Sequence, residues 1–319
     1  MITFHDVSKQ FPDGTIAVNR INFTITNGEF FVLIGPSGCG KTTTLKMMNR
    51  LIPLSEGTIL IDDKKISEYN IHELRWNIGY VLQQIALFPH MTIAENIAVV
   101  PELKQWSQDA IRKRVDELLG MVGLHPDTYR NRKPHELSGG EQQRVGVIRA
   151  LAADPDIILM DEPFSALDPI SREKLQDDMI ELQKKINKTI VFVTHDMQEA
   201  IKLADQVCLM KDGEIVQIGT PEQLLSNPAN DFVSDFVGSS NKIGSNFQLQ
   251  KIMQPLSSMK NDTTHTIDIT AKLDQVLAKL NNHSELYVTS DGNIKGKIDR
   301  QMMIHYLSTS LKEGGGEYV

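Results

Sequence analysis

Short runs of apolar and β-branched residues alternate with amphipathic segments along the first 240 residues of the chain. Four of these runs are typical of buried strands, at 30–35, 156–161, 189–194 and 206–210. Segments with helical spacing and charged residues on one face lie at 41–51, 141–153 and 170–186. Strands that alternate with helices predict an α/β fold, in which helices cover a mostly parallel sheet.

One stretch within this region departs from the alternation. Residues from about 86 to 153 are rich in helical patterns with few strand signals, which predicts a helical subdomain inserted in the α/β core. After the last helical pattern, Gly, Ser and Asn predict a linker over 239–255. We therefore expect a first domain at 1–238 and a small second domain at 256–310, built as helix, strand, Asp-Gly turn, strand and helix. The tail at 311–319 is expected to be disordered.

Composition and charge limit the class of protein. Of the 319 residues 40% are hydrophobic, yet no apolar run approaches the roughly 18 to 20 residues that cross a bilayer. The first residues lack the basic and apolar regions of a secretory signal. A net charge of -8 argues against nucleic acid as the main partner, and two cysteines are too few for a disulfide framework. We expect a cytosolic protein that reaches a membrane only through a partner.

A glycine-rich loop links the strand expected at 30–35 to the helix expected at 41–51. It fits the pattern G-x-x-x-x-G-K-[ST], with the residues Gly35, Pro36, Ser37, Gly38, Cys39, Gly40, Lys41 and Thr42. Such a loop turns successive backbone N–H groups toward phosphates at a helix N-terminus. We expect Lys41 to reach the β- and γ-phosphates of ATP, the Thr42 hydroxyl to bind Mg²⁺, and Thr43 to add a phosphate contact. A plain glycine turn is the alternative, but it leaves Lys41 without a role.

Three polar residues stand at the ends of two other predicted strands. Asp161 and Glu162 end one strand, and His195 follows the other. Asp161 suits the shell of Mg²⁺, and Glu162 is free to polarise the attacking water. His195 lies where ligands of such sheets bind, and we expect it to contact the γ-phosphate. The alternative for Asp161 and Glu162 is that they only end a strand, and the alternative for His195 is a structural role. The phosphate loop on the same sheet favours roles in catalysis and binding.

A second serine-and-glycine turn, LSGGE, lies at 137–141, almost a hundred residues after the glycine-rich loop. With the motifs above, it makes residues 1 to about 238 resemble the ATP-binding subunits of ABC transporters, which are P-loop NTPases with a RecA-like core, a β-subdomain and an inserted helical subdomain. The resemblance implies a head-to-tail dimer, with each ATP between one chain's phosphate loop and the other chain's LSGGE motif. The residues that would serve the partner's nucleotide are Ser138, Gly139, Gly140, Glu141 and, in a loop that crosses between subunits, Asp168.

Two more positions take their roles from this resemblance. Gln83 looks like the glutamine that senses the γ-phosphate and Mg²⁺ and leads to the transmembrane contact. Phe11 falls where the family stacks an aromatic ring, commonly tyrosine, on adenine; core packing is the alternative for Phe11. The expected catalytic residues are then Lys41, Gln83, Glu162 and His195. The expected Mg²⁺ ligands are Thr42, Gln83 and Asp161.

Three stretches, at 46–62, 78–106 and 220–238, further resemble the ATPases of importers for quaternary-amine osmoprotectants such as glycine betaine, carnitine, choline and proline derivatives. This implies a chain bound peripherally at the cytoplasmic face of the cell membrane. Its partners would be transmembrane permease subunits and, through them, an extracytoplasmic solute-binding protein. The alternatives are the ATPase of another ABC importer, for an amino acid, sulfate, sugar or metal, and a soluble ABC ATPase acting on ribosomes or DNA. One phosphate loop and no coiled-coil insertion favour a transporter.

The segment ALFPHMTIAENI, at 86–97, is expected to meet the permease. Leu87, Phe88, Pro89 and Met91 are expected to be exposed and to grip a short coupling helix. Ordinary packing within the helical subdomain is the alternative.

The second domain, at 256–310, resembles one cystathionine-β-synthase-type (CBS) repeat, a small α+β unit, most clearly in ELYVTSDGNIKGKIDRQMMIHYL. Such repeats normally work in pairs, and this chain has one. The ATPase dimer could join two single repeats into a regulatory module that responds to nucleotide or ionic strength. A degenerate dimerisation tail without a ligand is the equal alternative.

Overall fold

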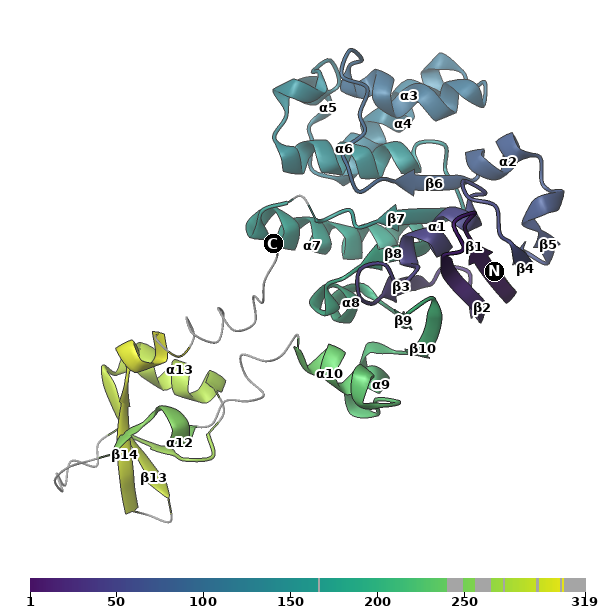
Figure 1. The fold of residues 1–319 in the computed structure, drawn as a ribbon. Coiled ribbons are helices and arrows are strands. Elements are labelled where there is room, and N and C mark those ends of the chain that lie inside the picture. The colour runs from purple at the N-terminus through teal and green to yellow at the C-terminus, as the bar shows by residue number, and fades with distance from the viewer. Residues whose placement is uncertain are drawn as a thin grey trace. The chain divides into compact units, whose positions relative to one another are not determined.

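The computed structural model describes residues 1–165, 167–239, 249–255, 265–271, 273–290, 293–304 and 306. The chain divides into two compact units, Met1–Ser234 and Asp235–Val319 (Figure 1). The glycine-rich loop, the acidic pair, His195 and the LSGGE motif all lie in the first unit.

The larger sheet of the first unit carries the strands that the apolar runs predict. Its order is β10 (Glu214–Gly219), β9 (Gln206–Lys211), β3 (Phe30–Ile34), β8 (Thr189–Thr194), β7 (Ile157–Asp161) and β6 (Ile78–Val81). Neighbouring strands are parallel except β9 and β10. Every residue of β3, β7 and β8 is buried, which is why these runs are almost wholly apolar.

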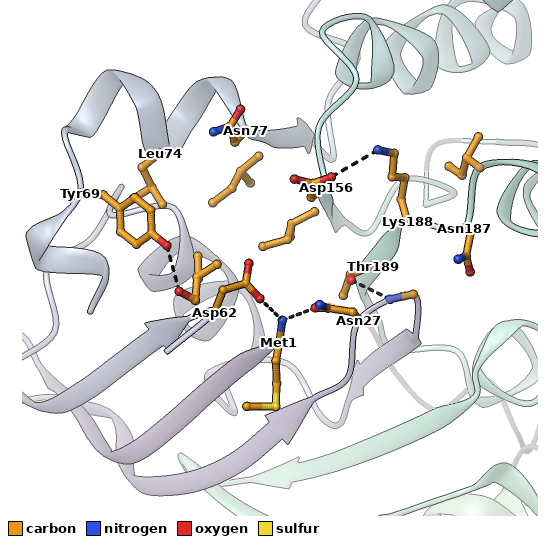
Figure 2. A pocket seen from close by; sticks show the side chains of 15 residues that line it. Met1, Asn27, Asp62, Tyr69, Leu74, Asn77, Asp156, Asn187, Lys188 and Thr189 are labelled. Atoms are coloured by element: carbon orange, nitrogen blue, oxygen red, sulfur yellow. Dashed lines mark hydrogen bonds and ion pairs between the residues drawn. The ribbon is translucent and has the colours of Figure 1, made fainter. Parts of the chain in front are cut away.

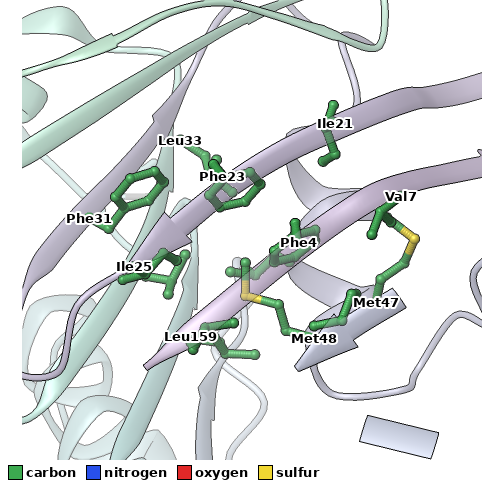
Figure 3. Packing of buried hydrophobic residues seen from close by; sticks show 14 of the residues in the cluster. Phe4, Val7, Ile21, Phe23, Ile25, Phe31, Leu33, Met47, Met48 and Leu159 are labelled. Carbon is green, nitrogen blue, oxygen red and sulfur yellow. The ribbon is translucent and has the colours of Figure 1, made fainter. Parts of the chain in front are cut away.

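A second, antiparallel sheet forms the β-subdomain. Its order is β2 (Ile16–Ile25), β1 (Ile2–Gln10), β4 (Glu56–Ile61) and β5 (Lys64–Lys65). The ring centroids of Phe4 and Phe23 are 4.3 Å apart, and those of Phe23 and Phe31 are 5.4 Å apart (Figure 3). Because Phe31 belongs to β3, this stack joins the two sheets into one core beneath the strand that leads into the glycine-rich loop.

Helices cover the larger sheet. Those that the spacing predicts are α1 (Lys41–Met48), α6 (Gly139–Leu151) and α7 (Pro169–Ile186). The others in the first unit are α2 (Ile71–Trp76), preceded by a 3₁₀ turn at Ile66–Glu68, and α8 (Met197–Leu203) and α9 (Pro221–Ser226). The helix α10 (Asp231–Ser239) follows α9 and spans the boundary between the two units. Of the helices in the described ranges, none has the length and apolar character that crossing a membrane requires.

Between β6 and β7 the chain forms the inserted helical subdomain, as predicted. It contains α3 (Ile93–Leu103), α4 (Gln108–Met121), α5 (Pro126–Tyr129), a 3₁₀ turn at Pro134–Glu136 and α6. Thr92 and Ser138 begin α3 and α6, each in a capping box with a glutamate three residues later. Figure 1 shows these helices gathered on the β6 side of the larger sheet.

The described part of the second unit is a sheet with helices around a small core. Its elements are α12 (Leu249–Ile252), β11 (Gln254–Pro255), β12 (Thr266–Asp268), α13 (Leu273–Asn282), β13 (Glu285–Ser290) and β14 (Asn293–Asp299), with the sheet order β11-β14-β13-β12. The first helix and the two strands predicted here correspond to α13, β13 and β14, and residues 300–304 are helical where the last helix was predicted. The predicted Asp-Gly turn at 291–292 lies outside the described residues. The short strand β12 was not predicted, and residues 249–255, expected in the linker, form α12 and β11, with β11 paired to β14. The predicted tail at 311–319 lies outside the described residues.

Candidate functional site

The glycine-rich loop bends tightly between β3 and α1. Gly35, Gly38 and Gly40 have φ angles of 149°, 81° and 102°, which residues with a Cβ rarely adopt. A Cβ on Gly35 would stand 2.2 Å from the carbonyl oxygen of Met210, and one on Gly40 would stand 2.3 Å from that of Ala17. Only glycine therefore lets the loop lie this close to two neighbouring backbones.

Lys41 begins α1 and curls back over the loop. Its side chain is buried, and its Nζ donates hydrogen bonds to the carbonyl oxygens of Gly35 and Pro36 at 2.7 and 2.9 Å. Gly40, the N-cap, has no side chain to cap the first N–H groups of the helix. These N–H groups and a buried ammonium with only neutral partners form a site suited to an anion such as phosphate.

The remaining loop residues differ in exposure. Ser37 is exposed at the tip with its neighbours Pro36 and Gly38, and Thr43 is half-buried on the first turn of α1. Cys39 is buried, with its Sγ 3.8 Å from the Nζ of Lys41. Burial raises the pKa of the Cys39 thiol more than the nearby ammonium lowers it, so the thiol is neutral and we assign it no chemical step.

Thr42 and Asp161 meet between α1 and the end of β7. The Thr42 hydroxyl donates to Oδ1 of Asp161 at 2.7 Å, and Asp161 is only 5% exposed. Burial raises the pKa of Asp161, and the hydrogen bond from Thr42 opposes this effect. A hydroxyl and a carboxylate held together in this way offer the oxygen ligands that Mg²⁺ prefers.

Glu162 lies between two other predicted residues, His195 and Gln83. Its Oε2 is 3.2 Å from Nδ1 of His195, which follows β8, and 3.5 Å from Nε2 of Gln83, which follows β6. Glu162 has a φ of 45°, a left-handed conformation of the kind that costs about 1–3 kcal/mol and gathers at active sites. Its backbone is fixed by bonds from its N–H to the oxygen of Val193 at 3.0 Å and from the Ser165 hydroxyl to its carbonyl at 3.0 Å.

Comparisons with known proteins identify the family. The ABC transporter family model matches residues 18–165. The glycine betaine/carnitine/choline transport ATP-binding protein OpuCA of Bacillus subtilis (strain 168) is 51% identical over 306 residues, which are 95% of this chain and 79% of that protein. The chain belongs to the ABC transporter ATP-binding proteins. The carnitine transport ATP-binding protein OpuCA of Listeria monocytogenes serotype 1/2a (strain 10403S) is 50% identical over 300 residues, 94% of this chain and 75% of that protein.

Solved structures of ABC ATP-binding proteins share the fold. CbiO1 of Clostridium perfringens, part of the ABC transporter complex cbiONQ, matches with a TM-score of 0.66 and 30% identity over 72% of this chain and 91% of its own. The ATP-binding cassette MJ0796, a dimer bound to ADP and Pi after hydrolysis, matches with a TM-score of 0.62 and 36% identity over 69% of this chain and 99% of its own. The P-loop fold, ATP binding and ATPase activity coupled to transport are thereby assigned to this ABC subunit, whereas the CBS assignment stays a prediction.

The LSGGE motif of this ABC subunit opens α6. Ser138 is the N-cap, and its backbone N–H and hydroxyl both donate to Oε2 of Glu141, at 2.8 and 2.9 Å. The other carboxylate oxygen of Glu141 accepts from the Tyr129 hydroxyl at 2.6 Å. Asp168, likewise, is the N-cap of α7 and accepts from the N–H of Ser171 at 3.0 Å. Their roles toward the nucleotide of a second copy stay predictions, as do those of Gly139 and Gly140.

Phe11 lies in the turn between β1 and β2. The turn is closed by hydrogen bonds from the Phe11 N–H to the oxygen of Thr15 at 2.9 Å and from the Gly14 N–H to the oxygen of Phe11 at 3.0 Å. The side chain is half-buried and stands outside the hydrophobic core cluster, with the Nζ of Lys9 5.1 Å from its ring centroid. This position favours a ring available to a ligand over core packing.

The segment expected to meet the permease is exposed only in part. Phe88 is 42% exposed and Pro89 is exposed, whereas Met91 is half-buried and Leu87 is only 9% exposed. The prediction for Leu87 was therefore wrong. The buried Asn96 fixes the turn, because it accepts from the Phe88 N–H at 2.8 Å and donates to the Phe88 oxygen at 3.1 Å, and the turn directs Leu87 inward.

Sequence reasoning missed three residues that support the site. Tyr129 bonds to Glu141 in the LSGGE motif, and Thr194 and Glu199 form a buried pair beside His195. A polar pair next to a predicted functional histidine was visible in the sequence, but only the packing of α8 on β8 brings its two members together. Tyr129 gave no signal, because its partner lies on another helix.

A separate cleft of about 380 Å³ lies at the amino ends of β6, β7 and β8, away from the strand ends that carry the predicted site (Figure 2). Its wall includes the amine of Met1, 2.6 Å from a carboxylate oxygen of Asp62, and Lys188, 3.4 Å from one of Asp156. None of the predicted site residues lines this cleft. Because parallel sheets bind ligands at the carboxyl ends of their strands, the nucleotide is expected at the glycine-rich loop and not in this cleft.

Proposed function

We propose that this chain is the ATP-hydrolysing subunit of a membrane importer for quaternary-amine osmoprotectants, of the glycine betaine, carnitine, choline and proline type. The observation that carries the proposal is identity of 50 to 51% over 94 to 95% of the chain with proteins named for the transport of these solutes. ATPases of other ABC importers share the same hydrolytic residues, so the solute rests on this likeness and not on the site.

The glycine-rich loop is proposed to hold the phosphates of ATP. Lys41 would exchange its carbonyl partners for the β- and γ-phosphates, with Thr43 nearby and the ring of Phe11 on adenine. The Thr42 hydroxyl, the Asp161 carboxylate and the Gln83 amide oxygen would hold Mg²⁺, a set of oxygen donors that fits this ion. Bound with ATP, Mg²⁺ neutralises charge on the β- and γ-phosphates.

Glu162 is the proposed general base. Its carboxylate accepts a proton as a water oxygen bonds to the γ-phosphorus, while the bond from that phosphorus to the bridging oxygen breaks and ADP leaves. His195, 3.2 Å from this carboxylate, would contact the γ-phosphate, and Gln83, 3.5 Å away, would report its presence. The strained backbone of Glu162 holds the carboxylate between these two side chains.

A second copy of the chain is proposed to complete each ATP site. The residues it would contribute are Ser138, Gly139, Gly140, Glu141 and Asp168. The first N–H groups of α6 and the hydroxyl of Ser138 suit a γ-phosphate, because a helix start attracts anions. Ser138 would then exchange its bond to Glu141 for the phosphate.

The permease is proposed to dock beside the Gln83 segment. A groove of about 470 Å³ opens there; its wall includes Trp76, Tyr80, Leu82, Phe88, Val99 and Arg149. Arg149 donates to the oxygen of Ala86 at 2.6 Å and so fixes the segment between the groove and the site. A short apolar helix of the permease fits such a groove, which would hold the chain at the cytoplasmic face of the membrane, with the solute-binding protein reached through the permease.

Uptake tests this proposal. A host without its own osmoprotectant importers would carry the transporter with either the native chain or Glu162→Gln, and uptake of labelled glycine betaine and carnitine would be measured at raised osmolarity. We expect uptake with the native chain and with the control Glu222→Gln, an exposed residue of α9, and none with Glu162→Gln. No uptake with the native chain, in cells where its ATPase activity persists, would overturn the choice of solute.

A further inference from the structure

Glu199 is a buried carboxyl group that the proposed hydrolysis does not use. Among the described residues, Asp161 and Glu199 are the two carboxyl groups that are less than a tenth exposed, each at 5%. Asp161 belongs to the site, whereas Glu199 lies on α8. Burying a carboxyl group is costly unless it has a partner. Here the partner is Thr194, the last residue of β8, whose hydroxyl donates to Oε2 of Glu199 at 2.5 Å.

This pair encloses the turn that carries His195. The Thr194 hydroxyl donates to Glu199 and also accepts from the N–H of Asp196 at 3.0 Å. Asp196 in turn caps α8 by accepting from the Gln198 N–H at 2.8 Å. Thr194 therefore bonds directly to the Glu199 carboxylate, and Asp196 is linked to it through the Thr194 hydroxyl. The imidazole of His195 itself is 61% exposed and faces Glu162.

Arg172 extends the arrangement to the segment before α7. One of its guanidinium nitrogens is 4.0 Å from Oδ2 of Asp196, and another donates to the oxygen of Leu167 at 3.4 Å. Burial raises the pKa of Glu199, the Thr194 hydroxyl and the Arg172 charge lower it, and Asp196 raises it. The His195 turn is thus connected to the segment that leads into Asp168.

We propose that Glu199 is a positioning residue for ATP hydrolysis, which acts through Thr194 to hold His195 against Glu162. A short bond from a hydroxyl to a carboxylate is among the stronger hydrogen bonds in proteins. Without the bond from Thr194 to Glu199, the Thr194 hydroxyl would either stay buried without a partner or rotate toward another one. In either case we expect the turn to shift and His195 to move with it. The inference rests on the proposed function, because it assigns to Glu199 a part in the same reaction.

Steady-state ATPase assays of the full chain test the inference. We expect Glu199→Ala and Thr194→Val to lower kcat about tenfold, equivalent to about 1.4 kcal/mol, with KM for MgATP changed less than about twofold. The double variant should be no slower than either single one, because both remove the same bond. Glu199→Gln keeps an acceptor of the same size and should restore kcat to within about threefold of the native value. Glu222→Ala, at an exposed position of α9, is the matched control.

The melting temperature of each variant is a second readout, which separates an effect on positioning from an effect on folding. Thr194→Val is nearly isosteric, so it keeps the inference testable if Glu199→Ala does not fold. Native kcat in a folded Thr194→Val or Glu199→Ala protein would overturn the inference. An equal loss of kcat in Glu199→Gln and Glu199→Ala, with melting temperatures lowered alike, would also overturn it. A native chain that hydrolyses no ATP would instead contradict the proposed function.

Discussion

Replacing Gly40 by alanine tests the geometry of the phosphate loop. Gly40 has a φ of 102°, and an added Cβ would stand 2.3 Å from the oxygen of Ala17 and 3.2 Å from Cγ2 of Val18. The left-handed conformation alone costs a residue with a Cβ about 1–2 kcal/mol. Because nonbonded heavy atoms are most stable at about 3.5 Å or more, the loop must also move by roughly 1 Å away from Ala17.

Such a displacement decides the expected size of the effect. A misplacement of about 1 Å at an active site can lower the rate by about 100-fold, so we expect a loss of this order in kcat/KM for MgATP. The melting temperature should fall by more than the strain alone predicts, which is about 2–8 °C for a unit of this size.

Gly123→Ala is the matched control for strain. Gly123 follows α4, has a φ of 70°, and a Cβ on it would meet nothing within 4 Å. We expect this variant to show the fall in melting temperature that strain alone gives and native kinetics. Thermal melts, ATPase assays and titration with a fluorescent ATP analogue would be run on the full chain. If Gly40→Ala matched Gly123→Ala in both stability and kcat/KM, the close approach to Ala17 would not constrain the loop and the reasoning would be refuted.

Three further predictions concern the core, the LSGGE motif and the second unit. Phe23→Ala, at the centre of the three stacked rings, should lower the free energy of unfolding by about 3–5 kcal/mol in urea titrations; a loss below about 1 kcal/mol would contradict the role given to the stack. Tyr129→Phe should lower the melting temperature at neutral pH by about 2–4 °C. The pKa of Glu141 is lowered chiefly by the hydrogen bond from Tyr129, so this bond contributes stability above pH 4.5, and the contribution is lost as the pH falls through the lowered pKa. The difference in melting temperature between Tyr129→Phe and the native chain should therefore vanish in acid. A difference that persists in acid would count against this role of the bond. A chain ended after residue 240 should lose the salt dependence of uptake if the second unit is regulatory; unchanged salt dependence would exclude a sensor.

The phosphate loop, the acidic pair and the histidine could be predicted because each follows a buried strand. Strands such as β3, β7 and β8 are buried on both faces, so they appear in the sequence as unbroken apolar runs. Parallel order then brings their carboxyl ends to one edge. The place of Glu162 between Gln83 and His195 follows from this order.

Other features depend on contacts that the sequence does not show. The strand β1 is irregular, with shifts in register against β2 and β4, and its alternation is correspondingly weak. Leu87 was predicted to be exposed, but the buried amide of Asn96 fixes its turn so that Leu87 points inward. The sequence does not show this contact. The strand β12 has only three residues, too few for a period to be recognised, and it gains its place by pairing with β13.

The proposed ATP site is composite, shared between two copies of the chain. Size-exclusion chromatography of Glu162→Gln with MgATP tests it most directly, because this variant should bind ATP without hydrolysing it. We predict that the variant elutes as a dimer with MgATP and as a monomer without nucleotide, and that Ser138→Arg, which places a large side chain at the shared phosphate, abolishes the dimer. A monomeric profile for Glu162→Gln at saturating MgATP would contradict the shared site.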